Sequence, residues 1–213
     1  MLEQLKEKVL HIAKKAVDVG LVHERAGNFS AIDRQSGLVA ITPSGIPREI
    51  LDVDGICIVD LDGKLVEGHY KPSSETPMHT CIFKALPWVQ GVVHTHSVFA
   101  TSFAASGKSI PAVTNEMVRF GGEIPLAPYQ IPGSLELGTT AVPFLEKHLA
   151  VLLEHHGVLT VGESLDEAFM NAVAVEDVAK IAVYSTIIGG PKPLTAEEID
   201  GIKEYKRAAA RKG

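Results

Sequence analysis

The alternation of apolar and polar residues divides the chain into short helical and extended segments. Over residues 1–20, apolar side chains recur three or four residues apart among lysines and glutamates, which predicts an amphipathic helix with one face toward a core. The stretches 28–33 and 37–42 flank a Gln-Ser-Gly turn and are typical of a β-hairpin. A second pair of strands is expected at 56–60 and 65–67, on either side of an Asp-Gly turn.

Helices and apolar strands alternate through the rest of the chain. Pro77 stands near the start of a helix that should end before Pro87, because proline fits the first helical turn. Thr195 and Glu198 have the spacing of a capping box at the start of the last helix. The other expected elements are a strand at 91–96, a short helix at 98–105, a strand near Ile124, a helix at 135–148, strands around Val151 and Val158, and a long helix at 165–188.

Length and composition favour one domain of the α/β class over residues 1–213. Hydrophobic residues make up 46% of the chain, and it contains no long linker, internal repeat or low-complexity tract. No stretch approaches the roughly 20 apolar residues that cross a membrane, and the first helix is not a signal peptide. We therefore expect no membrane association.

The charge balance limits the class of partner. A net charge of -6 argues against binding to nucleic acid, which favours a basic surface. A small molecule is the expected partner. The two cysteines, Cys57 and Cys81, are too few for a disulfide framework and lie in apolar surroundings, which indicates a reducing cytoplasm.

His94 and His96 are the strongest sign of chemistry in the chain. They follow an apolar run at strand spacing, so both imidazoles can point to one face and reach one metal ion. A third ligand is expected in a second histidine pair, His155 and His156. Only one of these two residues can face a given side of a strand. We choose His156, because the neighbouring Gly157 allows close approach of the backbone, and leave His155 as a packed or supporting residue. Three imidazoles suit zinc with one position open.

Glu75 is the candidate for that fourth position. It lies where the loop Lys71-Pro-Ser-Ser74 enters a helix, so its carboxylate can share a pocket with exposed N–H groups and hydroxyls. The alternative is an acidic residue that merely favours the first turn of a helix. His79 lies one turn beyond Glu75 and could orient it, but is more often structural in such a position.

Three short loops have the composition of an anion-binding cradle. Glycine lets the backbone approach a phosphate, while hydroxyl and amide groups donate hydrogen bonds to its oxygens. Each loop taken alone is equally typical of an ordinary turn. The residues concerned are Gly27 and Asn28, Ser44 and Gly45 within Thr42-Pro-Ser-Gly45, and Ser73 and Ser74.

These motifs together resemble the class II aldolase/adducin family, from about Val9 to Leu194. Within the family the chain is most similar to the L-fuculose-1-phosphate aldolases, with the L-ribulose-5-phosphate 4-epimerases close behind. The resemblance implies a three-layer α/β/α domain with a central, mostly antiparallel sheet, and a homotetramer with active sites between subunits. It rests, in chain order, on Gly27-Asn28, Thr42-Pro-Ser-Gly45, Lys71-Pro-Ser-Ser-Glu75, His94-Thr-His96, Ala127-Pro-Tyr129 and His155-His-Gly157.

The resemblance also implies roles for the motif residues. His94, His96 and His156 would hold one Zn²⁺ per chain, and Glu75 would ligate it at rest and act as general acid/base once substrate displaces it. The three loops would bind the substrate phosphate. Such a site would cleave a phosphorylated ketose, of the fuculose-1-phosphate or deoxypentulose-phosphate type, through an enediolate to dihydroxyacetone phosphate and an aldehyde.

Two positions depart from the family pattern. Asn115 stands where fuculose-type aldolases have a catalytic tyrosine, and Ala209 where they have another near the C-terminus. Tyr205, one turn earlier, is the candidate replacement. Glu116 resembles the catalytic glutamate of a related methylthioribulose-1-phosphate dehydratase and is a second candidate acid/base, although a loop carboxylate paired with Arg119 explains it equally well.

Other activities stay open beside the aldolase. Epimerisation at C4 and dehydration use the same fold, and Glu75 favours cleavage because the epimerases carry aspartate at the matching position. A noncatalytic adducin-like interaction module is the alternative from another class, and it would be expected to lack the metal set. Hydrolysis by a zinc hydroxide gives no reason for three phosphate-type loops.

Overall fold

The computed structural model describes residues 2–210 and is built around one eight-stranded sheet, with the strand order β4-β3-β2-β1-β5-β8-β7-β6. All neighbouring strands run antiparallel except β6 and β7, which are parallel. This confirms the mixed α/β class with a mostly antiparallel sheet. The strands are β1 (Asn28–Asp33), β2 (Leu38–Ile41), β3 (Cys57–Val59), β4 (Leu65–Glu67), β5 (Gly91–Thr95), β6 (Leu126–Ala127), β7 (Ala150–Leu153) and β8 (Gly157–Gly162).

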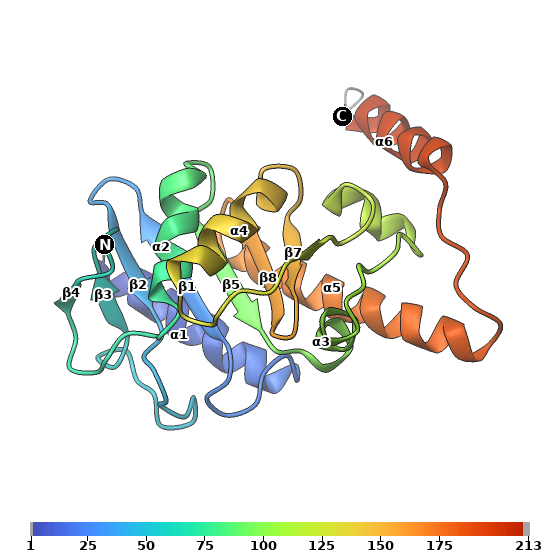
Figure 1. Cartoon of the computed structure of the whole chain (residues 1–213). Helices are drawn as coiled ribbons and strands as arrows, with labels where there is room; N and C mark the ends of the chain where they lie inside the picture. The colour runs from blue at the N-terminus through green and yellow to red at the C-terminus, as the bar shows by residue number, and fades with distance from the viewer. Residues whose placement is uncertain (1, 211–213) are drawn as a thin grey trace.

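Helices cover both faces of the sheet, so the chain forms three layers (Figure 1). On one face, α2 (Thr76–Ala85) and α4 (Leu135–Leu145) pack on the central strands and share a buried apolar core with them. On the other face lie α1 (Leu2–Asp18), α3 (Val98–Ala105) and α5 (Leu165–Ile187), with two further apolar clusters beneath them. The predicted three-layer arrangement is confirmed.

The C-terminal helix α6 (Ala196–Ala210) stands away from the sheet at the end of an extended segment (Figure 1). Its nearest neighbour is a 3-10 helix, η1 (Asn115–Phe120), which the sequence patterns had indicated only as loop. The predicted capping box is confirmed, because Thr195 N–H donates to Glu198 Oε2 at 2.8 Å and Glu198 N–H donates to Thr195 Oγ1 at 3.2 Å.

Local boundaries differ from the predictions where turns compete with regular structure. Strand β5 ends at Thr95, so His96 follows the strand, and α4 ends at Leu145. Ile124 makes a single bridge to Ile110 before β6 begins. The assumption that His155 and His156 lie in a strand was wrong, because both lie in the tight turn between β7 and β8, where His155 has a φ of 55°.

No helix within residues 2–210 combines the length and the apolar character that crossing a bilayer would demand.

Candidate metal centre and anion cavity

Strand pairing brings the first parts of the site together. In the centre of the sheet, β5 lies between β1 and β8, and its register sets His94 opposite Asn28 on one side and Leu159 on the other. His94 is fully buried at this point. The first residue of β1, Asn28, therefore lies beside His94 through strand pairing, although the two residues are far apart in the sequence.

Two glycines allow the surrounding turns to approach the histidines. A Cβ atom on Gly157 would lie 2.4 Å from the Thr95 carbonyl oxygen and 3.0 Å from the His96 ring. A Cβ on Gly27, whose φ is +68°, would lie 2.6 Å from the His94 carbonyl oxygen. The sequence predicted that Gly157 allows the backbone to come close to the candidate ligands, and this geometry agrees with that prediction.

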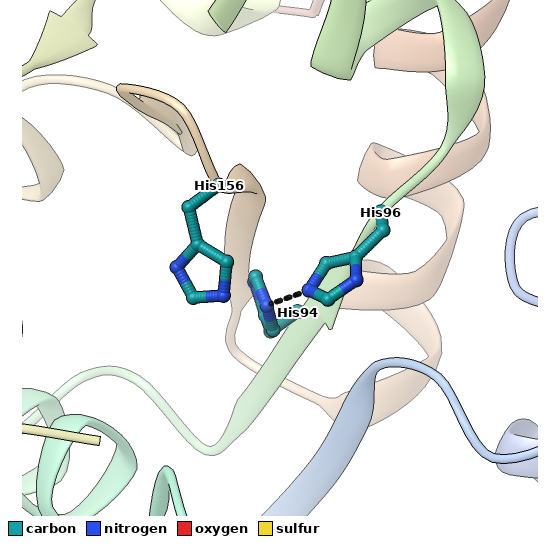
Figure 2. Close-up of side chains that lie close together, drawn as sticks. All are labelled: His94, His96 and His156. Carbon is teal, nitrogen blue, oxygen red and sulfur yellow. Dashed lines mark hydrogen bonds between the residues drawn. The ribbon is translucent and has the colours of Figure 1, made fainter. Parts of the chain in front are cut away.

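The three predicted imidazoles converge on one point. One nitrogen from each of His94, His96 and His156 lies within 4.8 Å of the others. The Nε2 atoms of His94 and His96 are 2.9 Å apart, and Figure 2 shows the His156 ring facing the same space from the β7–β8 turn. His155 is not part of this group and contacts the Tyr129 ring instead, with ring centroids 6.2 Å apart.

Hydrogen bonding sets the tautomer of His94. Its Nδ1–H donates to the Val158 carbonyl oxygen at 3.0 Å, which leaves the lone pair of Nε2 directed at the centre of the cluster. Burial lowers the pKa of His94 to about 3, so the ring is neutral at physiological pH. A neutral imidazole with a free Nε2 lone pair is the form that binds a metal.

Glu75 completes the group at the N-terminus of α2. Its carboxylate is buried and lies between two of the rings, with Oε2 3.2 Å from His94 Nε2 and Oε1 3.1 Å from His156 Nε2. Burial alone would raise its pKa, but positive charge at the positions of the His94 and His156 imidazoles and a hydrogen bond from Asn28 outweigh that effect and keep the pKa below its ordinary value. The ionised form of Glu75 is therefore the resident one.

This donor set fits a divalent metal ion. An anionic carboxylate oxygen and the lone pair of a neutral imidazole face each other at 3.2 Å, with no proton to share between Glu75 and His94. Such a contact is repulsive unless positive charge lies among the ligand atoms. Three nitrogens and one oxygen match the ligands that zinc prefers, and all four residues were predicted.

A buried hydrogen-bonded chain holds Glu75 from behind. Asn28 Nδ2 donates to Glu75 Oε2 at 3.1 Å, and Asn28 Oδ1 lies 2.5 Å from His79 Nε2. On its other side His79 Nδ1 lies 2.6 Å from the Ser30 hydroxyl. Because Asn28 Oδ1 can only accept, His79 donates from Nε2 and accepts from Ser30. The His79 side chain thus bonds to Asn28 rather than to the Glu75 carboxylate, and it could orient Glu75 only through Asn28.

The three predicted anion loops meet in one cavity of about 180 Å³ beside the histidines. His96 and Glu75 also line it, so the candidate metal centre and the candidate phosphate site share one space. Arg25 also lines this cavity and was missed, because a lone arginine in a polar loop carries no motif. The predicted residues that line the cavity are Gly27, Asn28, Ser44, Gly45, Ser73 and Ser74.

The two other predicted catalytic residues lie elsewhere in the single chain. Glu116 is in the first turn of η1 and lines a different hollow with Arg119, Asp177 and others. Tyr205 is 77% exposed on α6. Neither lines the cavity that holds Glu75 and His96. Their roles therefore stay predictions, and no ion pair joins Glu116 to Arg119 within residues 2–210.

Comparison with known proteins agrees with the geometry. The profile described as "Class II Aldolase and Adducin N-terminal domain" matches residues 7–183, and the chain belongs to this family. It is 40% identical over 194 residues to the L-ribulose-5-phosphate 4-epimerase UlaF of Salmonella paratyphi C, covering 85% of each chain. It is 33% identical over 202 residues to the 5-deoxy-D-ribulose 1-phosphate aldolase of Bacillus thuringiensis serovar kurstaki, covering 95% of each.

A solved structure supports the same relationship. An L-fuculose 1-phosphate aldolase superposes with a TM-score of 0.91 and 32% sequence identity, and the match covers 96% of each chain. The relatives thus include both aldolases and an epimerase. The family and the fold are shown, while the particular reaction is a separate question.

Proposed function

We propose that this chain is a zinc-dependent aldolase that cleaves a phosphorylated ketose, of the fuculose-1-phosphate or deoxypentulose-phosphate type, to dihydroxyacetone phosphate and an aldehyde. The observation that carries the proposal is the place of Glu75, whose carboxylate lies between His94 and His156 and also lines the anion cavity. One group can therefore reach both the candidate metal and a substrate held by its phosphate.

His94, His96, His156 and Glu75 would hold the zinc ion. When bound, zinc polarises the ketose carbonyl and stabilises the negative charge that remains after the C3–C4 bond breaks. Substrate oxygens would take the place of the Glu75 carboxylate. Freed in this way, Glu75 would exchange a proton at C3, while Asn28 and the neighbouring hydroxyl loops hold the phosphate.

Epimerisation at C4 is the second candidate, because the relative with 40% identity is a 4-epimerase. The two reactions are chemically close, since an aldehyde that stays bound can rejoin C3 with the opposite configuration at C4. Glu75 favours cleavage, because the family resemblance implies aspartate at the matching position of the epimerases. Both reactions use a phosphorylated sugar, and the residues that line the cavity suit either reaction.

We also propose a homotetramer with active sites between subunits, which would bring Glu116 or Tyr205 of a neighbour to the aldehyde end of the substrate. Large apolar side chains at the C-terminal end of α5 and just beyond it support an extensive interface, because Tyr184, Ile187 and Ile188 are 54%, 76% and 87% exposed in the single chain. The two free thiols, Cys57 and Cys81, support a cytoplasmic location.

A panel of ketose phosphates tests the reaction. Zinc-loaded protein is mixed with each compound, dihydroxyacetone phosphate release is followed, and product NMR identifies inversion at C4 or loss of water. Release from a fuculose-type or deoxypentulose-type substrate supports the aldolase. Inversion at C4 without release would assign the chain to the epimerases, and turnover of none of the panel would contradict both candidates.

A further inference from the structure

Arg48 is a buried arginine that joins two of the three loops around the anion cavity. Its side chain is 2% exposed, and its guanidinium donates from Nη1 to the Ile46 carbonyl oxygen at 2.9 Å and from Nη2 to the Gly27 carbonyl oxygen at 2.7 Å. Gly27 lines the cavity, and Ile46 directly follows Gly45, which also lines it. One side chain therefore fixes the spacing of both loops.

The charge of Arg48 has no counter-ion among the residues that the structure describes. Within residues 2–210, no carboxylate lies within ion-pair distance of its guanidinium, and its buried Nε has no hydrogen-bond acceptor. Both of its known acceptors are main-chain oxygens, and the Phe29 ring lies 6.0 Å from it. Burial lowers its pKa to about 10, which leaves it charged at neutral pH.

A buried charge is normally paired, because removing it from water is costly. Here the cavity whose wall Arg48 holds at Gly27 is a space that can admit an opposite charge. An anion bound in that cavity would lie across one peptide group from the guanidinium. The field of a buried cation acts over such a distance with little screening.

We propose that Arg48 is a positioning residue for the substrate phosphate: it clamps the Gly27 loop against the Gly45 loop and supplies the buried positive charge that the bound phosphate group neutralises. Arg48 does not touch the phosphate; the Gly, Ser and Asn donors do so. This inference rests on the proposed phosphate cavity, but it holds for any reaction of the phosphorylated substrate.

The test is calorimetric titration of inorganic phosphate into zinc-loaded wild-type protein and three Arg48 variants. Arg48→Gln and Arg48→Met remove the charge and should raise the dissociation constant for phosphate by about tenfold or more. Arg48→Lys keeps the charge but cannot donate to both carbonyls in the planar fork of arginine, so its affinity should fall between the wild type and Arg48→Gln.

Arg34→Gln is the matched control, because Arg34 also donates to main-chain oxygens, those of Phe83, Leu86 and Val89, but does not line the cavity. It should lose stability yet bind phosphate as the wild type does. With substrate, the Arg48 variants should raise KM far more than they lower kcat.

Wild-type phosphate affinity in Arg48→Gln or Arg48→Met would overturn the proposal. If the neutral variants do not fold, Arg48→Lys decides, because an affinity equal to that of the wild type would rule out the clamp. Loss of phosphate affinity in the Arg48 variants together with no turnover of any ketose phosphate would support this inference while contradicting the aldolase.

Discussion

His79 donates from Nε2 to the Oδ1 atom of Asn28, across a distance of 2.5 Å and in a fully buried setting. That bond fixes which end of the Asn28 amide faces the site. With Oδ1 turned to His79, the NH₂ group must face Glu75 and the anion cavity. A histidine that contacts neither the candidate metal nor the cavity thus sets the orientation of a group that lines the cavity.

Replacing His79 by two amides of different length tests this relationship. His79→Gln can place an N–H near the position of Nε2 and should keep kcat within a few-fold of the wild type, whereas His79→Asn is too short and should lower kcat by about tenfold or more. Steady-state kinetics and zinc content are measured for both. Equal kcat in the two variants, whether high or low, would show that the donated proton is not what matters.

Glu75→Gln should separate binding from chemistry. The amide keeps the size of the side chain but has no proton to exchange at C3, so C–C cleavage should fall by about a hundredfold or more, while binding of the phosphate ester persists. Calorimetry with a ketose phosphate and a cleavage assay on the same sample make the comparison. Glu75→Asp is the control that keeps the charge. Cleavage by Glu75→Gln at a near wild-type rate would remove Glu75 from its acid/base role.

Gly157→Ala should unfold the site. A methyl group there would lie 2.4 Å from the Thr95 carbonyl oxygen, so the β7–β8 turn must move and take His156 with it. We expect a loss of about 2–4 kcal/mol in the free energy of unfolding and loss of bound zinc. Gly201→Ala on α6, where a Cβ meets nothing within 4 Å, should be neutral or stabilising. Urea denaturation distinguishes the two, and equal stability of both variants would be inconsistent with the close approach.

Stability of the metal-free protein should fall in mild acid through His79. Burial, opposed by Glu75, lowers its pKa from 6.5 to about 4. Above the unfolded pKa both states are neutral. Between that value and the folded pKa only the unfolded state takes up a proton, so stability decreases as the pH falls, by up to about 1.4 kcal/mol per pH unit. His79→Gln should show a shallower fall between about pH 6.5 and 4. An identical pH profile in wild type and His79→Gln would contradict the buried neutral state.

Much of the site could be predicted because its residues form local patterns. His94 and His96 share a strand end, and Glu75 marks a helix start. His156 lies in one cluster with His94 and His96, and Gly157 makes the close approach that was the reason for choosing it. The assumption that His156 lies in a strand was wrong, because it lies in a turn. The spacing of residues along the chain does not predict the geometry of such a turn.

What the sequence did not indicate, the role of Arg48 and the contacts of His79, depends on parts of the chain that are distant in sequence. Arg48 reaches Gly27 across the loops, and His79 meets Ser30 and Asn28 only because α2 packs over β1. Such hydrogen bonds leave no periodicity in the sequence. Glu116 and Tyr205 illustrate the opposite limit, because family resemblance suggested roles that one chain alone does not bring into the cavity.

The metal content of the purified protein tests the central claim most directly. Elemental analysis of the wild type should give about one zinc ion per chain, and His94→Ala, which removes the buried central ligand, should give close to none. Wild-type protein without zinc, or equal zinc in the wild type and His94→Ala, would contradict a metal centre at His94, His96, His156 and Glu75.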